Sequence, residues 1–312
     1  VILEVASATE FKRVLKHTED GANIIVNTPF LSVELLDLIV KYGSFLNVNS
    51  LSQLQKLKEA RVKIPIGLRI NLPLNGVSPS RFGITLNDRN LKEITYLINR
   101  SDLKLTGLHC HFWSASREPY SFEERARKLY AYARTLKEIF PVEKLNIGGG
   151  FLGEVPPELR HQFTSADFTW MDYAKAIYEG FGSESGMELC IEPGGALVGS
   201  TMRFVAQVVD ITALHGENFA VLNTSNLHLR PTGHSKDLVF KVMRKGRGVS
   251  STYTLVGASC MESDRIGIYK GALAVGDYLI FENMGAYVYS YASDFILGRP
   301  EVKTVQKIFS LD

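Results

Sequence analysis

Three adjacent glycines, Gly148–Gly150, follow the apolar stretch KLNI. Glycine loses more conformational freedom on folding than any other residue, so three in a row need a physical reason. Backbone N–H groups that no side chain screens can cradle a phosphate at such a place. A tight turn would explain the same residues, and the glycines alone do not choose between the two interpretations.

Two histidines lie two residues apart in LTGLHCHF, and Ser114 follows them. Residues two apart on a strand point to the same face, so His109 and His111 share a face. The pair could place an imidazole against a planar ligand, with the Ser114 hydroxyl on a phosphate. A satisfied core histidine is the simpler explanation. A metal site has no obvious third ligand here, so we expect no metal.

Glu192 ends an apolar run and is followed by Pro193, Gly194 and Gly195. A carboxylate in this position could bind a protonated heteroaromatic nitrogen. It could equally cap a helix or form a salt bridge, and the residues alone favour neither.

Cys260 lies among small residues in GASCMESD, with Glu262 and Asp264 close by. A single cysteine among carboxylates could donate a proton. A buried small residue is the simpler interpretation, because free cysteine packs like a small apolar side chain.

The candidate residues up to Gly195 fall at or just after the ends of short apolar runs, and a helical pattern generally follows each run. The seven runs are ILEVA (2–6), NIIVN (23–27), FLNVN (45–49), IGLRIN (66–71), LTGLHCHF (105–112), KLNIGG (144–149) and ELCIEPG (188–194). Continuous apolar strands that alternate with amphipathic helices predict a parallel sheet covered by helices. A closed parallel barrel has eight strands and binds its ligands at their carboxyl ends. We therefore expect a (β/α)8 barrel whose first strand lies upstream of Val1.

The pattern changes after about residue 203, where β-rich segments are separated by turn residues. This change predicts a barrel over residues 1–203 and a mostly antiparallel β-domain over residues 204–312.

Composition narrows the class of protein. The 312 residues are 45% hydrophobic and carry a net charge of +2, which gives no basic field for nucleic acid. Three distant cysteines without a CxxC pair argue against a zinc site or a disulfide framework and fit a reducing cytoplasm. No apolar run reaches membrane-spanning length.

Taken in order, eight blocks of the sequence resemble the fold-type III pyridoxal 5'-phosphate (PLP) decarboxylases. This group includes diaminopimelate, ornithine and carboxynorspermidine decarboxylases and is related in structure to alanine racemase. The blocks are VASATE, LRIN, SRFGI, GLHCHFWS, LNIGGGFLG, EPGG, GASCMESD and ENMGAY. The resemblance covers nearly the whole chain. It implies a PLP-binding barrel followed by a β-domain, and a homodimer with shared active sites.

The resemblance also implies roles for single residues around the cofactor. His111 would lie against the ring face, and Glu192 would pair with the pyridine nitrogen. The positions that would hold the phosphate are Ser114, Gly148, Gly149, Gly150, Gly194, Gly195 and Tyr287.

Further roles concern charge and substrate. Cys260 would reach across the dimer interface and protonate the product carbanion. Glu262 and Asp264 lie where the family contacts substrate, and Arg69 and Glu4 match charged positions near the cofactor.

The reaction implied is decarboxylation at Cα of an amino acid through an external aldimine. Glu192 favours this reaction over racemisation, because a carboxylate keeps the ring nitrogen protonated and strengthens the electron sink. The related racemases place an arginine there, which weakens the sink. A racemase and a regulatory relative without catalysis are the alternatives. The lysine that binds PLP in this family is expected upstream of Val1.

Three positions depart from the family pattern. Gly195 replaces the arginine of EPGR, Met261 replaces an acidic residue after the cysteine, and Trp113 replaces a glycine. Backbone N–H groups, Arg230 or another cation would then balance the phosphate charge. We expect a substrate other than free lysine, ornithine or diaminopimelate. A modified or conjugated amino acid of siderophore, polyamine or peptide-antibiotic type fits better.

Overall fold

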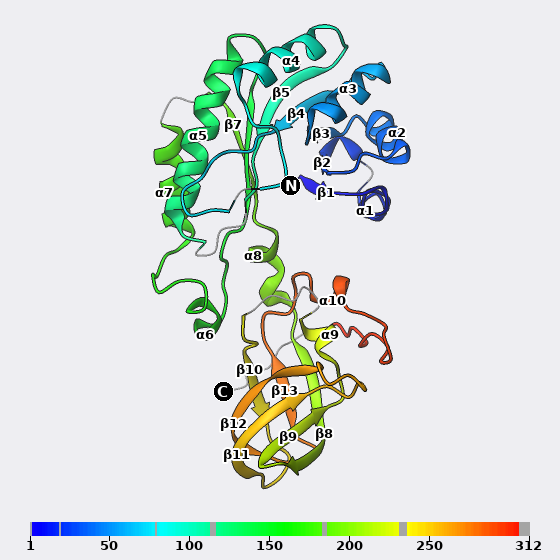
Figure 1. Ribbon diagram of the computed structural model, residues 1–312, viewed down its shortest axis with the longest axis vertical. Helices are drawn as coiled ribbons and strands as arrows, with labels where there is room; N and C mark the ends of the chain where they lie inside the picture. The colour runs from blue at the N-terminus through cyan, green and yellow to red at the C-terminus, as the bar shows by residue number, and fades with distance from the viewer. Residues whose placement is uncertain are drawn as a thin grey trace. The chain divides into compact units, whose positions relative to one another are not determined.

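The computed structural model describes residues 2–18, 20–78, 80–112, 117–182, 186–230 and 236–305 (Figure 1). The chain forms two compact units. The first holds Val1–Phe151 and Ala166–Pro193, and the second holds Leu152–Ser165 and Gly194–Asp312. The domain boundary expected at residue 203 stays a prediction.

The first unit is built on seven parallel strands that pair in chain order and form a nearly closed barrel (Figure 1). The strands are β1 (Leu3–Val5), β2 (Ile24–Asn27), β3 (Phe45–Val48), β4 (Pro65–Arg69), β5 (Lys104–His109), β6 (Lys144–Gly149) and β7 (Glu188–Glu192). Each expected apolar run overlaps one of them, and β4 and β5 begin one residue before their runs. The α/β class and the parallel barrel predicted from periodicity are confirmed.

Helices lie between successive strands, and most begin where a side chain caps the first turn. Ser7, Ser32, Ser50 and Asn87 each accept a bond from a backbone N–H of the helix that follows. The barrel helices longer than one turn are α1 (Ala8–Val14), α2 (Val33–Tyr42), α3 (Leu51–Glu59), α4 (Asp88–Asn99), α5 (Pro119–Lys137) and α7 (Trp170–Phe181). A single 3-10 turn, η1 (Gly21–Asn23), precedes β2.

Burial explains why the strands read as continuous apolar runs. Consecutive residues are buried on three strands, at positions 46–48 of β3, 66–68 of β4 and 145–147 of β6. Successive residues of a strand point to opposite faces, so both faces of these strands are covered.

The second unit holds a six-stranded mixed sheet in the order β10-β13-β8-β9-β11-β12 (Figure 1). Its strands are β8 (Phe204–Leu214), β9 (Glu217–Leu222), β10 (Phe240–Met243), β11 (Val249–Val256), β12 (Arg265–Leu273) and β13 (Tyr278–Phe281). Only β9 and β11 pair in parallel, so the mostly antiparallel character is confirmed. The short helical turns are α6 (Pro157–Arg160), α8 (Gly194–Val198), η2 (Gly199–Thr201), α9 (Asn226–Leu229) and α10 (Val288–Tyr291).

In the described part of the chain, no helix combines the length and the apolar character needed to cross a membrane.

Candidate active site

The carboxyl ends of four neighbouring barrel strands bring candidate residues together. Arg69 ends β4, His109 ends β5, Gly149 ends β6 and Glu192 ends β7. The parallel register sets Arg69 beside His109 and Gly149 beside Glu192. Residues that lie far apart in sequence therefore share the end of the barrel at which parallel barrels bind their ligands.

Glu192 is the centre of a buried hydrogen-bond network. Its side chain is only 10% exposed. One oxygen, Oε1, accepts bonds from the amides of Asn27 at 2.9 Å and Asn146 at 2.8 Å. The other oxygen, Oε2, lies 2.9 Å from Nδ1 of His111. His109 Nε2 is 3.1 Å from Oε1 but is not aligned for a hydrogen bond.

Both amides are oriented by a second bond on their own oxygen. Asn47 donates to the oxygen of Asn27 at 2.7 Å, and the Gly148 N–H donates to the oxygen of Asn146 at 2.9 Å. With the amide oxygens occupied, the two N–H₂ groups face Glu192. Asn146 thereby links the Glu192 carboxylate to the glycine loop.

Glu192 stays ionised although it is buried. Burial raises the pKa of the Glu192 carboxyl, but its interactions with His109 and His111 outweigh burial and hold that pKa far below its usual range. Burial lowers the pKa of His109, so this imidazole is neutral at neutral pH. We therefore assign the stabilisation of the carboxylate mainly to hydrogen-bond donors, with the Asn27 and Asn146 amides among them.

His111 faces two partners through one nitrogen. Nδ1 lies 2.9 Å from Glu192 Oε2 and 3.2 Å from the Gly149 nitrogen. A protonated Nδ1 can donate to Glu192, whereas only an unprotonated Nδ1 can accept from Gly149. The His111 ring is 41% exposed, so one side of it remains open to a ligand.

The three glycines have different reasons to be glycine. A Cβ on Gly148 would stand 2.4 Å from the Cys110 oxygen, and one on Gly149 would stand 2.3 Å from the Glu192 oxygen. Packing between strands therefore accounts for these two. Gly150 has φ +95°, and the nearest atom to its missing Cβ is the Phe112 oxygen at 3.6 Å. Of the three, only Gly150 combines a left-handed backbone with no close contact at its missing Cβ, so its conformation and not packing requires glycine.

Three of the predicted phosphate positions belong to the second unit. Gly194 and Gly195 open α8, and a Cβ on Gly195 would lie 3.9 Å from the Tyr287 ring. Tyr287 is 62% exposed and has φ +65°, a strained conformation for a tyrosine. The structure thus brings Gly195 and Tyr287 together. Ser114, and the departure at Trp113, lie outside the described residues.

The cysteines differ in exposure. Cys260 is exposed, Cys190 is partly buried and Cys110 is buried. Burial raises the pKa of Cys110 to about 12, so Cys110 is chemically inert. The expectation that Cys260 is a buried small residue is therefore wrong, because its loop presents it at the surface of the second unit.

The acidic residues near Cys260 also differ. Glu262 is exposed, whereas Asp264 is 3% exposed. The Asp264 carboxylate accepts bonds from the Ser259 hydroxyl and N–H and from the Asn226 N–H. It is occupied in holding the Cys260 loop against α9.

The same one-turn helix, α9, also holds the segment that follows Tyr287. His228 contacts the Thr224 hydroxyl at 3.2 Å through Nδ1 and the Ser293 carbonyl at 3.1 Å through Nε2. The Cys260 loop and the segment after Tyr287 are therefore both hydrogen-bonded to α9.

A metal ion is an alternative ligand for the barrel end. His109, His111 and Glu192 each place one ligand atom within 4.8 Å of the others, so Glu192 is the third ligand that the sequence did not reveal. The Asn27 and Asn146 amides direct N–H groups at the same carboxylate, and these would oppose a cation bound to Oε1. The donor set suits a neutral or N–H-bearing ring better.

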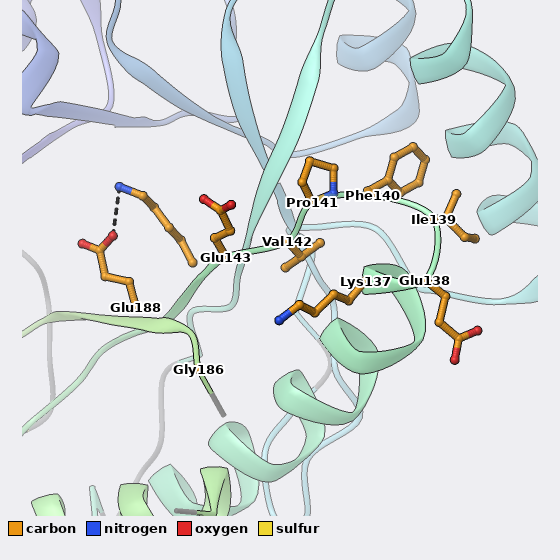
Figure 2. Close-up of a pocket in the computed structure, with 10 residues that line it drawn as sticks. Lys137, Glu138, Ile139, Phe140, Pro141, Val142, Glu143, Gly186 and Glu188 are labelled. Atoms are coloured by element: carbon orange, nitrogen blue, oxygen red, sulfur yellow. Dashed lines mark ion pairs between the residues drawn. The ribbon is translucent and has the colours of Figure 1, made fainter. Parts of the chain in front are cut away.

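A pocket of about 760 Å³ lies at the opposite end of the barrel, where β6 and β7 begin (Figure 2). It is lined by the end of α5, the segment before β6 and an ion pair of Lys144 with Glu188 at 3.1 Å. None of the candidate residues lines it. Its position agrees with a structural role for this end of a parallel barrel.

Sequence reasoning missed the amides and one buried cation. Asn27, Asn47 and Asn146 are polar residues inside otherwise apolar strands, and that anomaly could have identified them. Arg125 lies in the charged helical stretch FEERARKLY. Nothing in that sequence distinguishes the buried arginine from the exposed one.

Comparison with known proteins now identifies the class. A family model described as "Pyridoxal-dependent decarboxylase, pyridoxal binding domain" matches residues 1–199. The chain belongs to the pyridoxal-dependent decarboxylase family. The family and the cofactor class that the sequence predicted are confirmed.

Among its relatives is diaminopimelate decarboxylase of Vibrio cholerae, which is 28% identical over 97% of this chain and 74% of its own length. Mouse ornithine decarboxylase is 24% identical over 94% of this chain and 67% of its own length.

Solved structures agree in fold. Diaminopimelate decarboxylase of Helicobacter pylori, complexed with L-lysine, superposes with a TM-score of 0.79 at 21% identity, covering 94% of this chain and 76% of its own. The arginine decarboxylase of a Paramecium bursaria Chlorella virus superposes with a TM-score of 0.80 at 18% sequence identity. The match covers 96% of this chain and 81% of the viral enzyme. These likenesses show the barrel and β-domain architecture.

Proposed function

We propose that this protein is a PLP-dependent carboxy-lyase that decarboxylates an amino acid or an amino-acid conjugate. The observation that carries the proposal is the buried, ionised Glu192 at the carboxyl end of the barrel. A carboxylate there can keep a pyridine ring nitrogen protonated, which favours decarboxylation over racemisation. Membership of a pyridoxal-dependent decarboxylase family supports this assignment.

The barrel residues fit PLP. Glu192 has one oxygen occupied by two amides, and Oε2, which lies 2.9 Å from His111 Nδ1, has a second lone pair that would accept from a ring nitrogen. His111 stands beside Oε2 with part of its ring exposed, and no atom crowds the missing Cβ of Gly150. PLP, when bound, supplies the electron sink for breaking the Cα–carboxylate bond.

Each residue then has a stated task. Glu192 holds a proton at the ring nitrogen, and His111 orients the ring. Gly150, with Gly195 and Tyr287, would bind the phosphate, together with the remaining positions Ser114, Gly148, Gly149 and Gly194. Arg69 donates to the His111 carbonyl at 3.3 Å and so helps to set that segment.

Cys260 is proposed as the group that protonates the product carbon, acting in the active site of the partner subunit of a homodimer. Its exposure on a loop held by Asp264 suits a thiol that must meet a second subunit. Glu262 is the exposed carboxylate for substrate. Asp264 would contribute through loop position, since its oxygens are already bonded. Both the homodimer and a cytoplasmic location are predictions.

The substrate class follows from Met261. The position after the cysteine carries no charge that could hold a distal ammonium. Glu262 is one residue further on, and a shift of one residue in an extended chain turns a side chain to the opposite face. We therefore keep the prediction of a modified or conjugated amino acid.

The test is carbon dioxide release by the purified full-length protein with PLP. Lysine, ornithine, diaminopimelate and acylated or citryl conjugates of diamino acids are supplied in turn. We expect release from a conjugate, and a loss of about a hundredfold or more in Glu192→Gln. Glu188→Gln, on the other end of the same strand, is the matched control and should retain activity.

Two outcomes favour the alternatives. Inversion at Cα without carbon dioxide would indicate a racemase. PLP binding with neither reaction on any substrate would indicate a regulatory relative, and rapid turnover of free lysine would overturn the substrate prediction alone.

A further inference from the structure

Arg125 on α5 is a fully buried arginine with unusual partners. Nη1 donates to the Gly149 carbonyl at 2.8 Å, and Nη2 donates to the Phe112 carbonyl at 3.1 Å. The guanidinium also stacks 4.4 Å from the Phe122 ring centroid. Nε has no acceptor among the described residues.

No carboxylate in the described part of the chain pairs with Arg125. Its neighbours on α5 are committed elsewhere, since Glu123 pairs with Arg127 and Glu124 pairs with Lys128. Burial lowers the pKa of Arg125, but a guanidinium remains charged in proteins. A buried cation held only by carbonyls is costly unless an anion lies nearby.

The Gly149–Gly150 peptide is the part of the glycine loop that Arg125 contacts. The Gly149–Gly150 peptide is trans, so its carbonyl and its N–H point in opposite directions. The carbonyl points at Arg125, and the Gly150 N–H therefore points away from it, on the side where the parallel pairing of Gly149 with Glu192 sets it against the Glu192 carbonyl. A cation on the carbonyl also polarises the peptide and strengthens that N–H as a donor.

We propose that Arg125 is a positioning residue that supplies the buried positive charge for the cofactor phosphate, acting across the Gly149–Gly150 peptide without touching the phosphate. It would replace the arginine that stands after EPG in related decarboxylases, where this chain has Gly195. This inference rests on the proposed function, because it requires PLP at the barrel end.

Other cations fit this role less well. Arg230, the substitute first considered, lies 3.6 Å from Asp237 and so already faces a carboxylate. Arg69 stands near the negative charges of Glu192 and Glu4. Arg125 alone of the three is both fully buried and bonded to the glycine loop.

The experiment compares two ligands that differ only in the phosphate. PLP and pyridoxal are titrated into wild-type protein, Arg125→Gln, Arg125→Lys and the exposed control Arg127→Gln. We expect Arg125→Gln to bind PLP about tenfold or more weakly, from loss of one charge near a dianion, with pyridoxal affinity unchanged. Arg125→Lys keeps the charge and should lose less. Arg127→Gln should match the wild type.

A second measurement needs no variant and so does not depend on folding of Arg125→Gln. ³¹P NMR follows the titration of the phosphate in PLP bound to the wild-type protein. A nearby buried cation should lower the phosphate pKa below that of free PLP. An unchanged or raised phosphate pKa would overturn the proposal.

The remaining outcomes separate the two proposals. If wild-type protein binds PLP but Arg125→Gln weakens PLP and pyridoxal equally, Arg125 is only structural and this inference fails alone. If wild-type protein binds neither ligand, the proposed function fails as well.

Discussion

The barrel end and the loops of the second unit hold their candidate residues in opposite ways. At the barrel end, Glu192, His109 and Arg125 are buried, and Glu192 and Arg125 hydrogen-bond to neighbouring strands and loops. In the second unit, Cys260 and Tyr287 are exposed.

The residues that are buried behind those loops are the anchors. Asp264 and His228 bond to backbone groups and hydroxyls and leave the reactive positions outside. The two regions therefore differ in how their candidate residues are held. The barrel end holds its side chains in a bonded network, whereas the second unit presents Cys260 and Tyr287 at its surface.

The largest effect is expected from a second carboxylate at the barrel end. Asn146→Asp replaces an N–H donor 2.8 Å from Glu192 Oε1 with an oxygen. We expect a loss of about 3 kcal/mol in unfolding free energy at pH 7, because two carboxylates cannot both be ionised there. The folded state then binds a shared proton at a raised pKa, so the loss should shrink as pH falls.

Chemical denaturation of the wild type and Asn146→Asp at several pH values measures this loss of unfolding free energy. Asn87→Asp is the matched control, since asparagine and aspartate cap the start of α4 almost equally well. A loss for Asn146→Asp no larger than for the control would show that the Glu192 network is not a fixed, buried site.

A smaller effect is expected in the second unit. Asp264→Asn replaces an acceptor of backbone and hydroxyl donors and should cost about 2 kcal/mol of unfolding free energy. The neighbouring Glu262→Gln is exposed and should stay within about 0.5 kcal/mol of wild type. Urea denaturation of the two variants compares them directly. Equal stability would mean that Asp264 is no anchor and is available to substrate.

The sequence predicted the barrel strands well because their physics is local. Runs such as NIIVN and FLNVN are apolar on both faces, which is typical of a parallel strand covered on both sides. The candidate residues Glu192 and His111 could be placed because they follow such runs.

The support for those residues could not be predicted, because it depends on neighbours distant in sequence. Asn27 and Glu192 are 165 residues apart, and Arg125 reaches Gly149 only after α5 packs against the barrel. In the second unit, the same limit hid the burial of Asp264 beside the exposed Glu262. Two carboxylates two residues apart look alike in sequence, and only the packing of α9 separates them.

The smallest effect is a pH dependence that belongs to the barrel end alone. Burial lowers the pKa of His109 below its ordinary value of 6.5. Glu192 opposes this shift, whereas Arg69 and His111 add to it. The unfolded chain therefore binds a proton below pH 6.5 that the folded protein does not, and stability falls with acid by up to about 1.4 kcal/mol per pH unit.

The lowered pKa of Glu192 acts in a separate window. A depressed carboxyl stabilises the fold above its unfolded value of about 4.5 and loses that contribution only below it. Between pH 6.5 and 5 the slope should therefore report His109, less an opposite contribution from Glu4, whose carboxyl pKa is raised by burial and by Glu192. Thermal and urea denaturation across this range should show the slope in wild type and in His17→Gln, an exposed histidine after α1, but a reduced slope in His109→Gln. The same slope in all three proteins would mean that the acid sensitivity arises elsewhere, and the barrel end would lose its distinction as the pH-sensitive region.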